Sequence, residues 1–130
     1  MTEVHPGEYE RTFAAIAAQK ADAHFVAAHT YFVRDQKPII ELAAKHRLPA
    51  IYEWPEQAEA GGLMAYGSSL PDLYRRTADY VRRILEGARP AGMPVDQAAT
   101  FELVVNLATA KTLAPTIPPS LLQRADRLIQ

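Results

Sequence analysis

The sequence contains no cysteine, which excludes disulfide bonds and thiolate metal sites. It has no apolar run that approaches the roughly 20 residues of a membrane-spanning helix. Neither sign of charge is in clear excess, because 14 basic and 15 acidic side chains give a formal net charge of -1. This balance offers no electrostatic attraction for a nucleic acid or an anionic membrane. We therefore expect no nucleic-acid partner and no membrane insertion.

Motifs of common enzymes and cofactor sites are also missing. The chain has no Gly-x-x-x-x-Gly-Lys phosphate loop, no Gly-x-Gly-x-x-Gly fingerprint, no Gly-x-Ser-x-Gly elbow and no paired-histidine metal motif. Glu53, Glu56 and Glu59 recur every three residues, but nothing in the sequence separates their environments as acid and base catalysis requires. We predict no catalytic residues, no metal ligands and no cofactor. An enzyme that uses Glu53 and a histidine is the less favoured alternative.

What the sequence does contain is a stretch, Leu48–Gly67, around which the rest can be arranged. Pro49–Glu53 and Leu63–Tyr66 are short apolar runs without clean alternation, which is typical of strands covered on both faces. Between them, Trp54-Pro55 predicts a one-turn helix and Gly61-Gly62 predicts a break. Strands of this kind need helices in front of the sheet and behind it.

The flanking segments supply these helices and two more strands. The additional strands are expected at Ala23–Ala28 and Phe101–Asn106. Apolar spacing and capping residues predict helices at Glu8–Lys20, from Arg34-Asp35 to about His46, and at Leu70–Glu86, Leu107–Leu113 and Ser120–Ile129. This order predicts a single α/β domain over residues 1–130, with three layers and a mainly parallel sheet that carries helices on both faces.

A binding site is predicted at the carboxyl ends of the strands, where open parallel sheets hold their ligands. The loops at that edge are His29–Phe32, Glu53-Trp54 and Tyr66–Ser69. Aromatic rings and a carboxylate at such positions are suited to line a pocket for a small molecule, although Trp54 and Tyr66 would also serve as core aromatics. The predicted ligand-binding residues are Thr30, Tyr31, Glu53, Trp54 and Tyr66.

Four motifs in a fixed order resemble a known family. They are Pro-Ala-Ile-Tyr, Glu-Ala-Gly-Gly-Leu-Met-x-Tyr-Gly, Ile-Leu-x-Gly-Ala-x-Pro and Phe-Glu-Leu-Val-x-Asn. Over about residues 10–130 the chain is similar to the carboxyl-terminal part of the substrate-binding proteins of ABC-type importers, in the subgroup labelled as tryptophan/tyrosine transport proteins. Members have two α/β lobes with the ligand between them. The resemblance implies a truncated, periplasmic-binding-protein-like lobe, with residues 8–67 in the distal half of the second lobe and residues 68–130 returning to the first.

The resemblance also implies a function. It predicts a non-enzymatic domain that binds a small organic or amino-acid-like solute. The competing hypothesis is a degenerate or structural domain that oligomerises and binds no ligand. With no signal peptide in the sequence as given, the chain is expected in the cytoplasm, whereas a fragment of a longer precursor would be periplasmic.

A homodimer is predicted because a truncated lobe leaves strand edges and apolar helix faces without cover. The apolar side chains of Leu70–Glu86 form one stripe, which is expected to be buried, if necessary against another chain. Two interfaces are open at this point. One is a stripe on that helix formed by Leu73, Val81, Ile84 and Leu85, and the other is a C-terminal stripe formed by Leu121, Leu122, Leu128 and Ile129.

Overall fold

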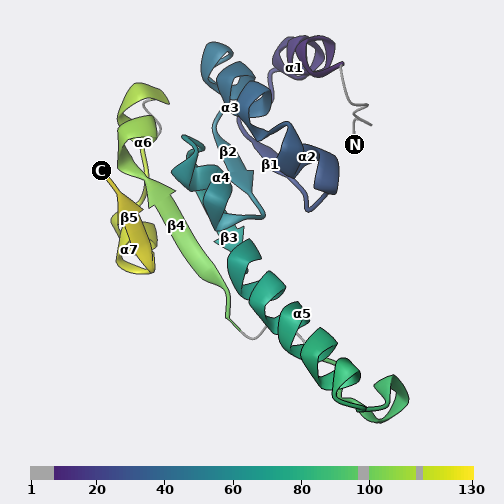
Figure 1. The fold of residues 1–130 in the computed structure, drawn as a ribbon. Coiled ribbons are helices and arrows are strands. Elements are labelled where there is room, and N and C mark those ends of the chain that lie inside the picture. Colours follow the sequence, from purple (N-terminus) through teal and green to yellow (C-terminus); the bar gives the residue numbers. More distant parts are fainter. Residues whose placement is uncertain (1–7, 97–99, 114–115) are drawn as a thin grey trace.

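A five-stranded sheet organises the chain, in the order β1-β2-β3-β4-β5 (Figure 1). The computed structural model describes residues 8–96, 100–113 and 116–130, so the remainder of the predicted domain 1–130 lies outside the described residues. The strands are β1 (His24–Val26), β2 (Ala50–Tyr52), β3 (Met64–Gly67), β4 (Glu102–Asn106) and β5 (Arg127–Ile129). Strands β1, β2 and β3 are parallel, β4 is antiparallel to β3, and β5 is parallel to β4. The predicted α/β fold with a mainly parallel sheet is confirmed.

Helices occupy most of the positions that the sequence predicts. They are α1 (Tyr9–Ala18), α2 (Thr30–Arg34), α3 (Gln36–Lys45), α4 (Pro55–Glu59), α5 (Leu70–Leu85), α6 (Leu107–Leu113) and α7 (Pro119–Gln123), with the 3-10 turn η1 (Pro90–Gly92). The one-turn helix α4 begins at Pro55, as predicted, because proline fits the first turn, where its missing N–H is not needed.

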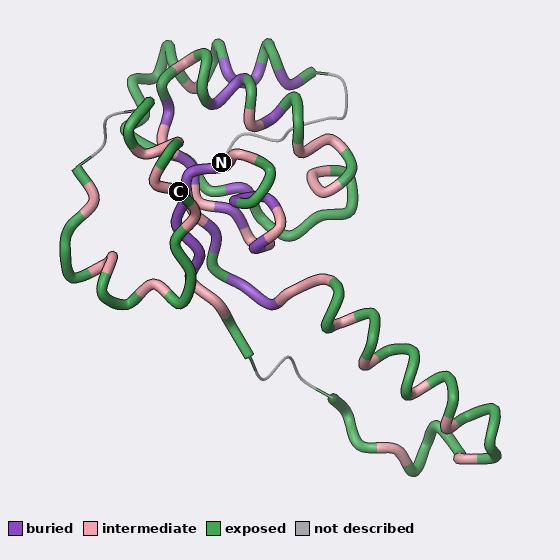
Figure 2. The backbone as a smooth tube through the Cα atoms, turned by 60° about the vertical axis from the view of Figure 1, so that its left-hand side comes forward, coloured by how far each residue is buried: buried purple, intermediate pink, exposed green. Residues whose placement is uncertain are grey.

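The core lies where the central strands meet α1, α3 and α4. Tyr52, Ala65 and Val104, from three neighbouring strands, are fully buried and belong to one apolar cluster with Phe13 and Ile39. Buried segments accordingly concentrate on the sheet in Figure 2. The stretch Leu48–Gly67 thus has the central place that its composition predicted.

The helix predicted at Ser120–Ile129 is wrong in its second half. Helix α7 ends at Gln123, and the chain then returns to the sheet as β5. Asp126 directs this change: its backbone N–H donates to the carbonyl of Leu103 at 2.9 Å, and its carboxylate accepts the N–H of Leu103 at 2.8 Å. The apolar residues Leu128 and Ile129 continue the helical spacing of the sequence, but they pair with β4.

The loop predicted at His29–Phe32 is the start of helix α2. His29 takes the N-cap position, and its ring Nδ1 accepts the backbone N–H of Tyr31 at 3.2 Å. This helix start could not be predicted, because histidine is not among the usual capping residues, which are serine, threonine, aspartate and asparagine.

The apolar stripe predicted at Leu70–Glu86 is not buried within the described part of the chain. None of the residues of α5 is buried, and the helix projects away from the sheet in both views (Figures 1 and 2). The chain leaves the sheet at Ser68 and returns at Thr100, whose carbonyl accepts a hydrogen bond from the Ser68 hydroxyl at 3.0 Å. We call residues 68–100 the arm.

Two adjacent glycines shape the turn between α4 and β3, and each should resist replacement. Gly61 has φ +111, in the region that L side chains rarely adopt. A Cβ on Gly62 would lie 2.6 Å from Cε2 of Tyr52 and 2.8 Å from the carbonyl oxygen of Gln57. We expect Gly61→Ala and Gly62→Ala each to lower the free energy of unfolding by more than the ~1 kcal/mol of a propensity change.

Urea unfolding of the two variants measures this effect. Gly92→Ala is the matched control, because its Cβ would meet nothing within 4 Å and its φ is not positive. If Gly62→Ala unfolded at the same urea concentration as Gly92→Ala, the close approach to Tyr52 would not constrain the fold.

Candidate functional site

The register of the parallel strands brings the predicted site loops to one edge of the sheet. Tyr52 pairs with Val26 on one side and with Ala65 on the other. Glu53 directly follows β2, whereas Tyr66 is still part of β3 and pairs with Leu103 of β4. The loops predicted after β1 and β2 therefore begin at the carboxyl ends of adjacent parallel strands, and the third loop begins only after Gly67.

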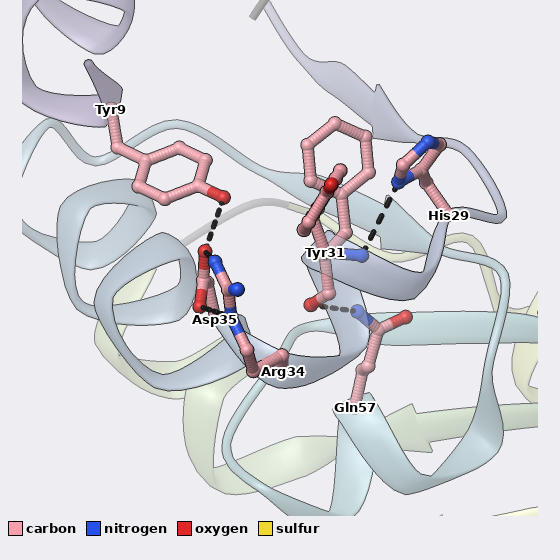
Figure 3. A network of polar contacts seen from close by, with 7 residues as sticks. Tyr9, His29, Tyr31, Arg34, Asp35 and Gln57 are labelled. Carbon is pink, nitrogen blue, oxygen red and sulfur yellow. Dashed lines mark hydrogen bonds and ion pairs between the residues drawn. The ribbon is translucent and has the colours of Figure 1, made fainter. Parts of the chain in front are cut away.

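A buried glutamine joins the loop after β2 to helix α2. The side-chain amide of Gln57 donates to the carbonyl oxygen of Phe32 at 3.4 Å (Figure 3). The side-chain oxygen of Gln57 accepts the backbone N–H of Trp54 at 3.3 Å. Only 1% of Gln57 is exposed. This residue was absent from the predicted site, because a glutamine in a short polar helix carries no sequence signal of such a role.

Tyr31 presents an exposed ring at the α2 side of this edge. Its ring stacks on that of His29 with 5.0 Å between centroids, and the guanidinium of Arg34 lies 5.1 Å from the centroid of Tyr31. Arg34 is held by Asp35 at 2.6 Å, and the Tyr9 hydroxyl donates to the same carboxylate at 2.7 Å (Figure 3). The hydrogen bonds from Arg34 and then Tyr9 lower the pKa of Asp35 to about 2. Asp35 therefore stays ionised and keeps Arg34 beside Tyr31.

Glu53 and Trp54 differ in what they can offer a ligand. The carboxylate of Glu53 forms no hydrogen bond or ion pair with the described residues, and it is not buried. The indole N–H of Trp54 is buried and has no hydrogen-bond partner in the described part of the chain. Glu53 can thus reach a ligand with its charged group, whereas Trp54 can contribute only the exposed portion of its ring.

The other two predicted residues lie at the margins. Thr30 is the first residue of α2 and is exposed. Tyr66 is 54% exposed, and its ring stacks on that of Phe101 with 5.8 Å between centroids. Gln57 links the backbone of Trp54 to that of Phe32 in α2, while the ring of Tyr66 packs on the side of β4.

A second residue that the sequence reasoning missed fixes the start of the arm. The carboxylate of Glu56 accepts the hydroxyl of Ser69 at 3.2 Å and the backbone N–H of Leu70 at 3.1 Å. A carboxylate at this position satisfies a first-turn N–H of α5 and interacts favourably with the helix dipole. Glu56 thereby couples the loop after β2 to α5.

An apolar cavity of about 400 Å³ lies beneath α1, apart from the predicted site. Its walls include Phe13, Ile16, Val26 and Phe32, and none of the five predicted ligand-binding residues lines it. His24 also borders the cavity, and burial lowers the pKa of its imidazole. Both ring nitrogens are buried and have no hydrogen-bond partner among the described residues, and the ring packs against those of Phe13 and Tyr52. His24 fills space in the core and does not resemble a catalytic base.

Two further features are absent from the described ranges. No group of three or more His, Asp and Glu side chains is placed to hold a metal ion there. None of the helices within those ranges is both long and apolar enough to cross a membrane.

Comparisons with known proteins agree on one family. The family model described as ABC transporter substrate binding protein matches residues 8–129. No curated protein matches the chain. A solved structure of a conserved domain protein from Vibrio cholerae is 27% identical with a TM-score of 0.86, covering 98% of this chain and 43% of that one. The ABC domain in complex with L-Trp from Streptococcus pneumoniae is 27% identical with a TM-score of 0.83, covering 94% of this chain and 41% of that one.

A third structure supports the fold alone. It is a ligand-free, open substrate-binding protein with adhesive properties from Clostridium difficile, 19% identical with a TM-score of 0.62. The match covers 98% of this chain and 42% of that one. The chain thus spans about two-fifths of the length of the solved structures that it matches.

Proposed function

The chain belongs to the ABC transporter substrate binding protein family, and we propose that it binds a small organic solute at the carboxyl edge of β1, β2 and β3. Proteins of this family bind solutes and do not transform them, which supports the prediction that the chain is not an enzyme. They are normally periplasmic, and we propose the same location for this chain. Because the chain spans about two-fifths of its solved relatives, the activity of a complete binding protein is itself a proposal here.

One observation carries the proposal. The carboxylate of Glu53 is accessible and has no partner among the described residues, at an edge where the rings of Tyr31 and Tyr66 are also exposed. A carboxylate in this position would pair with an ammonium group or another strong hydrogen-bond donor, and the rings would pack against the apolar part of the solute. This combination favours an amino-acid-like solute. The relative solved in complex with L-Trp supports the same class.

The lobe assignment belongs to the proposal as well. Residues 8–67 would form the distal half of a second lobe, and residues 68–130 would include the return to the first. The Ser68–Thr100 hydrogen bond supports this division, because it ties together the outgoing and returning segments at the edge of the sheet. The ligand would then lie between the strand-end loops and polypeptide that faces them.

Calorimetric titration of the protein with the free amino acids and small amines tests the proposal. We expect one class of these solutes to bind, and Glu53→Gln to weaken its affinity by roughly tenfold or more, because a hydrogen bond to a charged group contributes about 1.5–3 kcal/mol. Trp54 is the sole tryptophan, so its fluorescence should report binding of non-fluorescent solutes at the same edge.

The matched control is Glu41→Gln, because Glu41 is an exposed carboxylate on α3. It should bind the solute as the unaltered protein does. Equal losses in Glu53→Gln and Glu41→Gln would contradict the site. Absence of binding across the whole panel would favour the alternative of a structural domain without a ligand.

A further inference from the structure

The start of helix α2 relies on the imidazole of His29. The first N–H groups of a helix have no partner within the helix and need one from outside it. The carbonyl oxygen of His29 accepts the N–H of Phe32 at 3.0 Å and that of Val33 at 3.2 Å. The N–H of Tyr31 is left to the ring Nδ1 of His29, at 3.2 Å (Figure 3). The imidazole therefore anchors the residue whose ring the proposed site uses.

The same imidazole packs against the ring that it helps to hold. The rings of His29 and Tyr31 stack with 5.0 Å between centroids and an interplanar angle of 21°. The ring of Phe32 lies 5.7 Å from that of His29. A hydrogen bond to the backbone of Tyr31 and a stacking contact with its ring thus come from one side chain.

Only the neutral imidazole can make this hydrogen bond. A neutral ring accepts through one nitrogen and donates through the other, whereas the imidazolium donates through both. Nδ1 must therefore be unprotonated, with the proton on Nε2. Protonation of Nδ1 would set an N–H of His29 against the N–H of Tyr31. It would also place a positive charge at the helix start, where the helix dipole disfavours cations. Acidification therefore removes the cap.

The charged groups around this pair keep their charge while the imidazole titrates. Histidine is the side chain whose ordinary titration range lies between pH 5 and 8. The guanidinium of Arg34 lies 5.1 Å from the centroid of Tyr31 and is paired with Asp35. The hydrogen bonds from Arg34 and then Tyr9 lower the pKa of Asp35 to about 2, and burial raises the pKa of Tyr9 to about 12. Among the described side chains of this cluster, His29 is therefore the one that changes charge in that range.

We propose that His29 is a positioning residue for the solute site, and that protonation of its imidazole weakens solute binding by releasing Tyr31. The inference rests on the proposed function, because Tyr31 belongs to the predicted site. At neutral pH the cap holds the ring of Tyr31 at the carboxyl edge of β1, and in acid the ring loses this anchor. Within the described chain, the carboxylate of Glu53 forms no ion pair with His29, so the cap acts through Tyr31.

Nuclear magnetic resonance of the free, isotope-labelled protein tests the cap without any solute. The ring nitrogens of His29 report the tautomer, and the backbone amide of Tyr31 reports the hydrogen bond. As the pH falls from 8 to 5, we expect Nδ1 to pass from unprotonated to protonated and the Tyr31 amide signal to shift with the same midpoint. His29→Asn should hold that amide signal nearly constant, because asparagine caps helices and does not titrate. A neutral ring protonated on Nδ1, or a Tyr31 amide that does not follow the ring of His29, would overturn the proposal.

Calorimetric titration with L-tryptophan at pH 8 and at pH 5 tests the effect on binding. We expect the affinity of the unaltered protein to fall by about threefold to tenfold in acid, as loss of an N-cap typically costs. His29→Asn should remove this pH effect, and His29→Ala should bind weakly at both pH values. The matched control is His46→Asn, which removes an imidazole at the end of α3 and should keep the full pH effect.

The pH profile separates positioning from a merely structural role. An equal pH effect in His29→Asn and in the unaltered protein would overturn the proposal, since another group would then cause it. An affinity that is the same at both pH values in the unaltered protein would do so as well. Absence of L-tryptophan binding at both pH values would contradict the proposed solute and, with it, the effect on binding. The amide measurements would still confirm or refute the cap in that case.

Discussion

Gly67→Ala is expected to disrupt the native sheet. An added Cβ would lie 1.8 Å from the carbonyl oxygen of Glu53 and 3.0 Å from its carbonyl carbon. The obstacle is backbone, so no side-chain rotation can relieve it. Gly67 is also buried and pairs with Glu102 of β4. To make room, β3 must move away from the end of β2, and its pairing with β4 must shift as well.

The expected loss in free energy of unfolding exceeds the ~1–3 kcal/mol of ordinary overpacking. Against a typical total of about 5–15 kcal/mol, such a loss removes a large share of the stability and should lower the unfolding midpoint markedly. Urea unfolding followed by circular dichroism measures it, with Gly92→Ala as the variant that should behave like the unaltered protein, since its Cβ meets nothing within 4 Å. A cooperative Gly67→Ala transition within ~1 kcal/mol of that control would show that the strand ends separate easily.

Asn106→Leu should destabilise the protein by about 2–4 kcal/mol, because it removes one buried and one partly buried hydrogen bond and leaves their backbone partners unsatisfied. The side-chain amide of Asn106 donates to the carbonyl oxygen of Ala58 at 3.0 Å, and its oxygen accepts the backbone N–H of Thr109 at 3.0 Å. Asn106 is only 5% exposed and joins β4 to α4 and to the first turn of α6. Leucine has a similar volume but offers neither a donor nor an acceptor.

The comparison is with Thr112→Ala on α6. The Thr112 hydroxyl also donates to a backbone carbonyl, that of Ala108 at 3.1 Å, but the bond is exposed. A surface change of this kind usually stays within about 0.5 kcal/mol. Thermal unfolding of both variants measures the difference. If Asn106→Leu melted together with Thr112→Ala, an apolar contact would replace the amide without loss.

The strands that could be predicted from the sequence are those formed by short apolar runs. Ala50–Tyr52 lies inside the predicted run Pro49–Glu53, and Met64–Gly67 is shifted by one residue from the predicted run Leu63–Tyr66. Their parallel order follows from the helix between them. The last strand could not be separated from helix α7 in this way. Leu121 and Leu128 fit one helical stripe, and the contacts that end the helix come from Leu103, far away in the sequence.

The edge of the sheet that holds the predicted site could be inferred, whereas the contacts between side chains could not. Strand order places the loops of Tyr31, Glu53 and Tyr66 at one edge. The partner that turns Tyr66 toward β4 is Phe101, which follows the whole arm in the sequence. Gln57 likewise acquires its role through the carbonyl of Phe32 on another helix. The five ligand-binding residues therefore remain predictions that the titrations above address.

Because β3 and β4 are antiparallel, their connection does not require a segment as long as the arm. Antiparallel neighbours can be joined by a two-residue hairpin, yet here the whole arm connects them. The free-energy cost of closing a loop rises by only about 0.6 kcal/mol for each doubling of loop length, so the long connection destabilises the sheet only slightly. The hydrogen bond between Ser68 and Thr100 joins the two ends of the arm where it leaves the sheet. In terms of chain connectivity the arm is an insertion that the sheet does not require, and its length is free to match whatever surface α5 must meet.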